Sequence, residues 1–226
     1  MKKNIDIIII SDAKTDQLKA LTRQTLKTLF NSDTNVNFYA YVIESSTANF
    51  SKIHPNVKMV YPKIAFGYHK YLNIGRKLGK SEYVCLCNND LIFKKNWATN
   101  IISEMESNNL VSASPLSVDN NTARFNISEN TGIHFGYVIG MHIAGWCILH
   151  KRNIYDKIGD LDERFIFWYC DDDYAQTLKS KKIKHGLITS SRVDHAISKT
   201  LNTKSKPEFN RLTRQQQKTF NDKWKI

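Results

Sequence analysis

Short apolar runs alternate with stretches of helical periodicity over the first half of the chain. Between residues 18 and 30, leucines and a phenylalanine recur at spacings near three and four, which predicts a helix with one apolar face. A second helix is predicted over residues 67–78, directly before Gly79. Strand-like apolar runs flank these helices at residues 5–10, 36–43, 57–61 and 83–87. Strands that alternate with helices form right-handed crossovers, so we expect a Rossmann-like α/β fold whose mostly parallel central sheet is flanked by helices.

The second half of the chain continues with less regular spacing. A polar stretch over residues 117–131 has no period, and we expect a mobile loop there. No linker separates the segments on either side, so we expect one domain over residues 1–198, with a basic helical tail over 199–226 that packs on it or extends it. The pattern predicts helices at residues 96–107, 153–158, 171–181 and 207–224, and strands at 110–114, 133–139, 143–150, 183–188 and 192–194.

The 226 residues carry a formal net charge of +12, and much of the excess follows His195. Such a basic tail favours an anionic partner such as nucleic acid, a membrane surface or an anionic polymer, although an Asn- and Lys-rich composition alone would also produce it. No apolar run is long enough to cross a membrane, so we expect no transmembrane segment and a cytoplasmic location, the host cytoplasm if a bacteriophage encodes the protein. The four cysteines lie in apolar or aromatic surroundings and are expected to be small buried hydrophobes.

Three small polar residues, Asn88, Asn89 and Asp90, end the apolar run at residues 83–87. Open α/β sheets bind their ligands beyond the carboxyl ends of the strands. Asp90 offers a hard oxygen ligand beside two neutral amides, which suits a divalent cation that carries a phosphate. A simple turn would use the same residue types. The chain contains neither a Gly-x-Gly-x-x-Gly motif nor a phosphate-binding loop, which argues against a typical dinucleotide or ATP site.

Asp171, Asp172 and Asp173 open a predicted helix directly after an aromatic segment. The helix dipole stabilises acids at this position, so capping alone accounts for one or two of them. Adjacent helical residues point about 100° apart, and an apolar wall raises the pKa of a nearby carboxylate, which is the tuning that a general base needs. His195 ends a strand-like run, where it is either structural or completes a metal site with Asp90.

Several short motifs, taken in order, resemble those of family 2 glycosyltransferases of the GT-A fold, over residues 4–198. They are Ser11-Asp12, Glu44 to Thr47, Asn73 to Arg76, Leu86 to Asp90, Gly145 to Arg152, Ile158 to Phe165, Asp171 to Tyr174 and Val193 to His195. The resemblance implies a transferase that uses a nucleotide-sugar, usually a UDP-sugar in this family, together with Mn²⁺ or Mg²⁺. It implies donor-binding roles for Ser11, Glu44, Asn73, Arg76, Lys77, Asn88 and Asn89.

Roles at the metal and at the reacting bond are implied by the same resemblance. Asp90 corresponds to the metal-binding acid of the family's Asp-x-Asp motif, in which Asn88 takes the place of the first Asp, and His195 to a C-terminal histidine that contacts metal or diphosphate. Asp171 corresponds to the base that deprotonates the acceptor hydroxyl in one inverting displacement, with Asp172 as an alternative. The residues implied on the acceptor side are Gly145, Trp146, Trp168 and Tyr169.

The acceptor and the oligomeric state are left open by the sequence. Hydroxymethylated bases of DNA, which some bacteriophages modify, fit the compact size and the positive charge, and we favour them over a cell-surface glycan or a lipid-linked acceptor. A third hypothesis is a non-catalytic nucleic-acid-binding protein on a GT-A scaffold, with Asn88 as a sign of lost metal binding. The presence of Asp90, Asp171 and His195 argues against it.

Overall fold

The computed structural model describes residues 1–51, 53–195 and 206–226. The strands are β1 (Lys3–Ser11), β2 (Val36–Glu44), β3 (Val57–Val60), β4 (Tyr83–Asn88), β5 (Leu91–Phe93), β6 (Ser112–Leu116), β7 (Ile133–Phe135), β8 (Cys147–Lys151) and β9 (Gly186–His195). The helices are α1 (Asp16–Ser32), α2 (Tyr68–Arg76), α3 (Trp97–Ser107), η1 (Val118–Thr122, a π-helix), α4 (Ala123–Phe125), η2 (Arg152–Ile154, a 3-10 turn), α5 (Tyr155–Ile158), α6 (Cys170–Ser180) and α7 (Lys206–Trp224).

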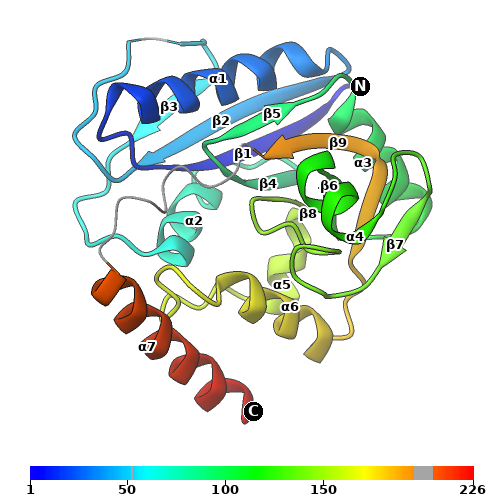
Figure 1. Ribbon diagram of the computed structural model, residues 1–226. Helices are drawn as coiled ribbons and strands as arrows, with labels where there is room; N and C mark the ends of the chain where they lie inside the picture. Colours follow the sequence, from blue (N-terminus) through cyan, green and yellow to red (C-terminus); the bar gives the residue numbers. More distant parts are fainter. Residues whose placement is uncertain (52, 196–205) are drawn as a thin grey trace.

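One nine-stranded sheet forms the centre of the protein (Figure 1). Its order is β3-β2-β1-β4-β8-β6-β9-β5, and β7 pairs with β9 beside this path. The first four strands are mutually parallel, and their register places Ser11 opposite Glu44, and Ile10 opposite Asn88. The polar residues that end β1, β2 and β4 therefore meet at one edge of the sheet.

The predicted α/β fold, with a central sheet flanked by helices, is confirmed, and the sheet is mixed rather than mostly parallel. Strand β8 is antiparallel to both of its neighbours, β4 and β6, while β9 is parallel to β6 and antiparallel to β5 and β7. The chain between β6 and β8 contains only short helical turns and the short strand β7, so no long crossover helix fixes the direction of the returning strand. Apolar runs mark a strand without giving its direction, which is why the sequence pattern did not predict the antiparallel pairings of β8, β5 and β7.

Several predicted boundaries also change in this half. The polar stretch at 117–131 is not an irregular loop, because it contains η1, α4 and the buried Asn121. The Asn121 side chain accepts a hydrogen bond from the Ser117 amide and donates to the carbonyls of Gly140 and Met141, so the segment is packed. The two strands predicted over 183–194 form the single strand β9, and those predicted over 133–150 shorten to β7 and β8.

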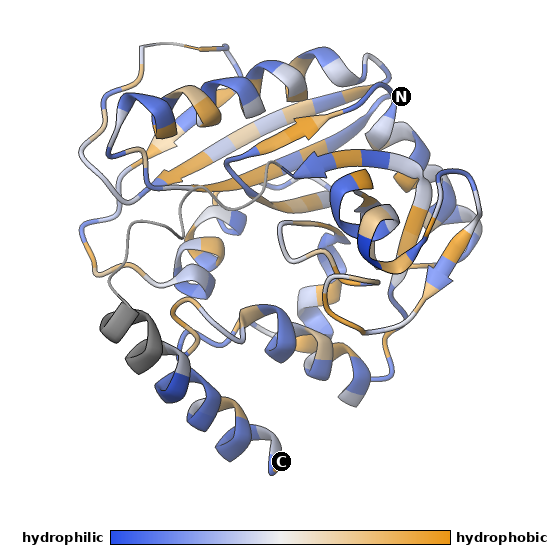
Figure 2. Cartoon of the chain, in the orientation of Figure 1, coloured by the Kyte–Doolittle hydropathy of each residue, from blue (hydrophilic) through white to orange (hydrophobic). Residues whose placement is uncertain are grey.

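Helices cover both faces of the sheet and create two apolar layers. On one side, alternate residues of β1 pack with α1 and α3, including the fully buried Leu26 and Trp97. On the other side, the remaining residues of β1 pack with α2, α5 and α6, including Tyr71 and Leu178. Figure 1 shows α1 on one side of the strands and α2, α5 and α6 on the other, and Figure 2 shows apolar residues concentrated along the central strands.

All four cysteines are buried, as the sequence predicts. Cys85 and Cys87 lie on the same face of β4, and the Cys85 sulfur lies 3.4 Å from that of Cys87 and 3.7 Å from that of Cys147 in β8. The surroundings are apolar, and three thiolates around a divalent cation would leave a net negative charge there. We therefore interpret the group as core packing.

Helix α7 packs against the loop before α6 and against the start of α6. The Gln216 side chain accepts a hydrogen bond from the Ile166 amide and donates to the Arg164 carbonyl. Trp224 donates to Asp173 in α6 over 2.9 Å. The predicted tail helix is thus present and packed, whereas the proposed domain boundary near residue 198 lies outside the described residues. None of the helices in the described ranges is long and apolar enough to span a membrane.

Candidate active site

Asp90 and His195 meet at the carboxyl edge of the parallel strands. Asp90 lies between β4 and β5, and β5 pairs with the end of β9, where His195 stands opposite Leu91. The Oδ1 atom of Asp90 lies 3.2 Å from Nε2 of His195. Both atoms are buried, and neither makes a hydrogen bond within the described residues. The Trp146 ring stacks on the imidazole, with ring centroids 5.4 Å apart and an interplanar angle of 12°.

This pair fits a divalent cation. A buried carboxylate oxygen without a hydrogen bond faces an imidazole nitrogen in the same condition, and a hard cation would satisfy both atoms. Two ligands at right angles around an ion at about 2.1 Å lie about 3 Å apart, close to the observed separation. The stacked indole fixes the plane of the ring. The structure brings together the two residues that the sequence analysis paired, and they form a candidate metal site.

Asn88 reaches this edge through a contact that the sequence did not reveal. The hydroxyl of Tyr68, the first residue of α2, donates a hydrogen bond of 2.9 Å to Oδ1 of Asn88 and lies 3.3 Å from the carbonyl oxygen of Gly145. Since the amide oxygen accepts from the phenol, the amide nitrogen of Asn88 is the group left to donate to a ligand. Burial raises the pKa of Tyr68 well above its ordinary value, and the nearby Asp171 charge adds to the effect, so the phenol remains a donor.

Asp171 faces the same region from the start of α6. A Cβ atom built on Gly145 would lie 2.0 Å from the Asp171 carboxylate, so glycine is required at position 145 to leave room for this acid. Burial, and after it the Asp172 charge, raise the pKa of Asp171 to about 6, and His195 opposes the shift. A carboxylate with this pKa can take a proton from a hydroxyl near neutral pH.

The three consecutive acids have different surroundings. Burial raises the pKa of Asp172, whose side chain lines a surface groove along α6. Asp173 is buried and is bound by Trp224 and Lys223 of α7, at 2.9 and 2.7 Å. Of the three, Asp171 alone is packed against Gly145, which favours it over Asp172 as the candidate base.

Two candidate donor-binding residues lie at the ends of β1 and β2. Oε1 of Glu44 accepts hydrogen bonds from the amides of Ala13 and Ser46, while Oε2 is buried with no partner among the described residues. Glu44 thus presents one unused acceptor. The Ser11 hydroxyl instead lies 3.0 Å from that of Thr22, and Asn89 donates to the Thr22 hydroxyl over 2.9 Å. Ser11 and Asn89 join β1, β4 and α1 inside the protein, so their geometry favours a structural role.

Three further candidates lie at or near the far end of α2. The Asn73 side chain donates a hydrogen bond to the Leu161 carbonyl and accepts one from the Leu161 amide. Arg76 and Lys77 form ion pairs with Asp160. The Arg76 guanidinium also lies 4.0 Å from the centroid of the Tyr155 ring. Because Arg76 is eight residues from Tyr68, a helical rise of about 1.5 Å per residue places it roughly 12 Å further along α2. The structure does not bring this group together with Asp90.

Trp168 and Tyr169 end the aromatic segment just before α6. Tyr169 has a left-handed backbone with a φ of 59° and packs on Phe220 of α7, at 5.3 Å between centroids. Trp168 meets Phe167 edge to face, at 4.9 Å. Both aromatic residues lie beside Asp171 along the chain, whereas Gly145 and Trp146 contact the site itself.

The mixed central sheet with helices on both faces, and the polar edge where β4 ends, match the GT-A fold. Among solved structures the chain is similar to a mannosyltransferase of Pyrobaculum calidifontis in complex with GDP-Man and Mn²⁺ (TM-score 0.65, 11% identity, 88% of this chain and 59% of that one). It is also similar to GalNAc-T7 with UDP, GalNAc and Mn²⁺ (TM-score 0.65, 11% identity, 93% of this chain and 48% of that one). A third similar structure is S. aureus TarS 1-349 (TM-score 0.60, 11% identity, 85% of this chain and 59% of that one).

The chain therefore spans about half to three fifths of the length of these structures. No protein-family model matches the sequence. No curated protein matches it either.

Proposed function

We propose that the protein is an inverting, metal-dependent glycosyltransferase that moves a sugar from a nucleotide-sugar to an acceptor hydroxyl. One observation carries the proposal: a carboxylate tuned to take up a proton, Asp171, lies in the same site as the buried Asp90–His195 pair, which fits a divalent cation. The GT-A fold supports it, because the similar mannosyltransferase and GalNAc-T7 structures contain a nucleotide or nucleotide-sugar with Mn²⁺.

The donor would be held at the ends of the parallel strands. The buried Oε2 of Glu44 is suited to accept an N–H of the nucleotide base, and the N–H of uracil has the required donor character. The Asn88 amide nitrogen would donate to an oxygen of the ribose or diphosphate. Asp90 and His195 would hold Mn²⁺ or Mg²⁺, which supplies positive charge against the departing diphosphate.

In the proposed reaction, the acceptor oxygen bonds to the anomeric carbon as the bond from that carbon to the phosphate oxygen breaks. The electron pair of the broken bond leaves on the nucleoside diphosphate, and the acceptor proton passes to Asp171. Gly145 keeps this carboxylate free of steric contact, and Tyr68 fixes Asn88 on the donor side. A single displacement of this kind inverts the anomeric configuration, and it needs one base and no protein nucleophile.

A donor screen tests the proposal. Nucleotide release from a panel of UDP- and GDP-sugars would be measured with Mn²⁺ for the parent, Asp90→Ala and Asp171→Asn, with Asp119→Asn as a control that changes an exposed carboxylate. We expect release by the parent and by the control, and losses of a hundredfold or more in the two site variants. Mn²⁺ binding would be measured from the electron paramagnetic resonance signal of the unbound ion. It should be lost in Asp90→Ala and retained in Asp171→Asn.

A parent that releases no nucleotide from any donor, with or without acceptor candidates, would contradict the enzyme assignment. That result, together with DNA binding that weakens with salt, would favour the non-catalytic nucleic-acid-binding alternative. Release by the parent that Asp171→Asn leaves unchanged would retain the enzyme and remove Asp171 as the base.

A further inference from the structure

A lysine cluster lies at the end of α6 and in the turn that follows it, formed by Lys179, Lys181, Lys182 and Lys184. Residues 179–184 are the only six-residue window of the sequence that contains four cationic side chains. All four are exposed, and none of them forms an ion pair with a carboxylate of the described residues. The helix dipole favours cations in the last turn of α6, but Lys184 lies beyond that turn.

The backbone of the turn exposes these lysines. The Ile183 amide donates a 2.9 Å hydrogen bond to the Leu178 carbonyl, and the Lys182 amide donates one of 3.1 Å to the Lys179 carbonyl. The two bonds form a Schellman motif, in which Lys182 takes the left-handed position with a φ of 53°, where glycine is usual. Ile183 is buried in the core beside Leu178. A buried anchor therefore fixes the turn, while the lysines on either side of it remain in solvent.

An apolar segment at residues 135–139 presents the second feature of this surface. Phe135 and Val138 are 54% and 53% exposed. Apart from the two ends of the chain, they are the most exposed large hydrophobic residues in the part that the structure describes. Single exposed hydrophobic residues are ordinary, but two in one segment indicate a contact surface when they adjoin further apolar groups.

The apolar segment adjoins the lysine cluster. The Tyr137 hydroxyl donates a 2.8 Å hydrogen bond to the carbonyl of Ile183, which lies between two of the lysines. Val138 and Lys179 line the same groove of about 320 Å³ along α6, and Phe220 of α7 adds apolar surface to it. Exposed apolar side chains and unpaired ammonium groups therefore share one surface.

This combination favours an anionic lipid bilayer over a nucleic acid. At a bilayer surface, apolar side chains enter the boundary of the acyl chains while lysines attract the anionic headgroups. A nucleic-acid phosphate is commonly bound by the planar fork of arginine, and the cluster contains lysines alone. Asp172 is the one acid that lines the groove, and it precedes Lys179 by seven residues of α6, roughly 10 Å.

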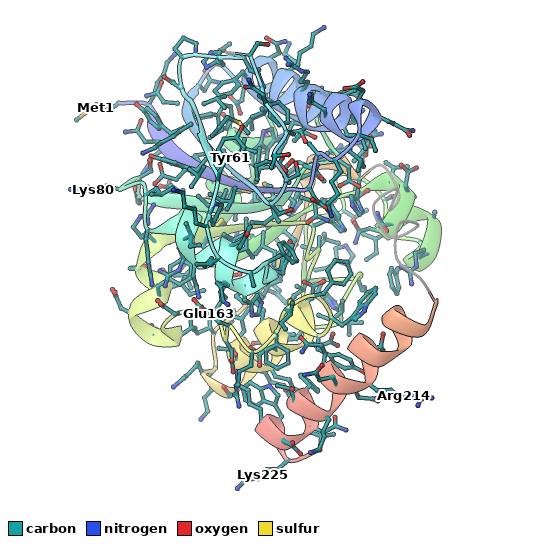
Figure 3. The ribbon with its side chains drawn as sticks, turned by 90° about the vertical axis from the view of Figure 1, so that its left-hand side faces the viewer. Met1, Tyr61, Lys80, Glu163, Arg214 and Lys225 are labelled. Carbon is teal, nitrogen blue, oxygen red and sulfur yellow. The ribbon has the colours of Figure 1, made fainter. Side chains whose placement is uncertain are left out.

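Helix α7 adds positive charge outside this surface. Figure 3 shows Arg214 and Lys225 projecting from α7 away from the body of the protein. The side chain of Lys218 is 81% exposed. These cations raise the positive potential around the molecule, which strengthens its long-range attraction to an anionic surface.

The surface lies at the opposite end of β9 from the candidate metal site. Phe135 pairs with Gly186, the first residue of β9, whereas His195 is the last. Nine residues of extended chain separate Gly186 from His195, which corresponds to at most roughly 30 Å. A partner bound at the lysine cluster would therefore leave Asp90 and His195 uncovered.

We propose that the lysine cluster and the apolar segment at 135–139 form a docking surface for an anionic lipid bilayer. Phe135 and Val138 enter the interface of the bilayer, and the four lysines contact its headgroups. The inference goes beyond the proposed function and does not depend on it, because the surface contains none of the residues assigned to the transfer reaction.

Co-sedimentation with lipid vesicles tests the charge. The full chain would be mixed with vesicles of phosphatidylcholine alone or of phosphatidylcholine with phosphatidylserine. We expect binding to the second kind only, and binding that weakens with salt. Each lysine near an anionic surface contributes about fivefold, so Lys181→Gln/Lys182→Gln should bind roughly 20- to 30-fold more weakly.

The matched control is Lys27→Gln/Lys95→Gln. It removes two exposed lysines that line a separate hollow beside α1, and it should bind vesicles like the parent. Absence of vesicle binding by the parent, or an equal loss in the two double variants, would overturn the proposal. Duplex DNA that binds through Lys181 and Lys182, without any vesicle binding, would also overturn it and assign the surface to nucleic acid.

Insertion of the apolar segment has its own test. The four native cysteines are buried, so the thiol introduced by Val138→Cys can be labelled selectively with a polarity-sensitive fluorophore. Ile64→Cys is the control, since Ile64 is 50% exposed in the segment between β3 and α2. Vesicles containing phosphatidylserine should shift the emission to shorter wavelength at position 138 and not at position 64. An unchanged emission at 138 while the protein sediments with the vesicles would refute insertion of the apolar segment.

Discussion

Asp171 should destabilise the fold at the pH at which it would work, and Asp171→Asn measures by how much. The pKa of this group is raised from 3.8 to about 6, mainly by burial and then by the Asp172 charge. A difference of about 2.2 units corresponds to about 3 kcal/mol between the two protonation states. Part of the side chain stays accessible to water, so about 3 kcal/mol is the upper value.

The direction of the pKa shift of Asp171 determines whether stability rises or falls with pH. Because the folded pKa lies above the unfolded one, the fold favours the protonated acid, and this stabilisation is complete below about pH 3.8. It is lost as the pH rises through about 6, where the folded carboxyl ionises. Asparagine stays neutral throughout. The variant should therefore gain up to about 3 kcal/mol over the parent at about pH 7.5, and the gain should disappear near pH 4.

Urea unfolding of the metal-free protein at several pH values provides the assay, with Asp119→Asn as the control. A gain of this size corresponds to a rise in Tm of roughly 6 to 12 °C for a chain of this length. Asp172→Asn, which removes the neighbouring charge, should move the midpoint of the pH dependence to lower pH. A stability difference between parent and Asp171→Asn that stays constant from about pH 4 to 7.5 would refute the reasoning.

Three further predictions concern other parts of the site. Asn88→Asp adds a carboxylate beside the candidate metal site, so Mn²⁺ should bind about tenfold more tightly by the free-ion resonance assay, and weaker binding would count against a cation there. Gly145→Ala places a Cβ atom 2.0 Å from the Asp171 carboxylate, so transfer should fall about a hundredfold while circular dichroism shows a folded protein; an unchanged kcat would contradict this placement of the base. Trp224→Phe removes the 2.9 Å hydrogen bond to Asp173, so chemical unfolding should show a loss of about 1 to 3 kcal/mol, and an unchanged midpoint would mean that α7 contributes little.

The parts of the site that local sequence could predict are those fixed at strand ends. Glu44 and Asn88 end apolar runs, and parallel pairing brings those ends to one edge of the sheet whatever the rest of the chain does. The meeting of Asp90 with His195 depends on the antiparallel pairing of β5 with β9, two segments about a hundred residues apart. No local pattern contains that pairing. The position of His195 at a strand end left a structural role and a metal site with Asp90 both open, and the resemblance to a known family favoured the metal site.

Other roles depend on partners that the local sequence does not indicate. Tyr68 was missed because its partner Asn88 lies twenty residues further along the chain, and an aromatic residue at the start of a helix ordinarily indicates packing. Arg76 was placed at the donor from a motif, yet it lies at the end of α2 and pairs with Asp160. Asp173 could be separated from its two neighbours only when α7 was seen to bind it.

The junction between β4 and β8 divides the candidate site into two parts whose sequences can change independently during evolution. Glu44, Asn88 and Asp90 lie at the ends of the parallel strands, while Gly145 directly precedes β8 and Asp171 lies at the start of α6. Under the proposed function, substitutions, insertions or deletions on the second side would change the acceptor without disturbing the residues proposed to hold the donor. A lineage carrying this fold could thus acquire new acceptors while its sugar supply stays the same.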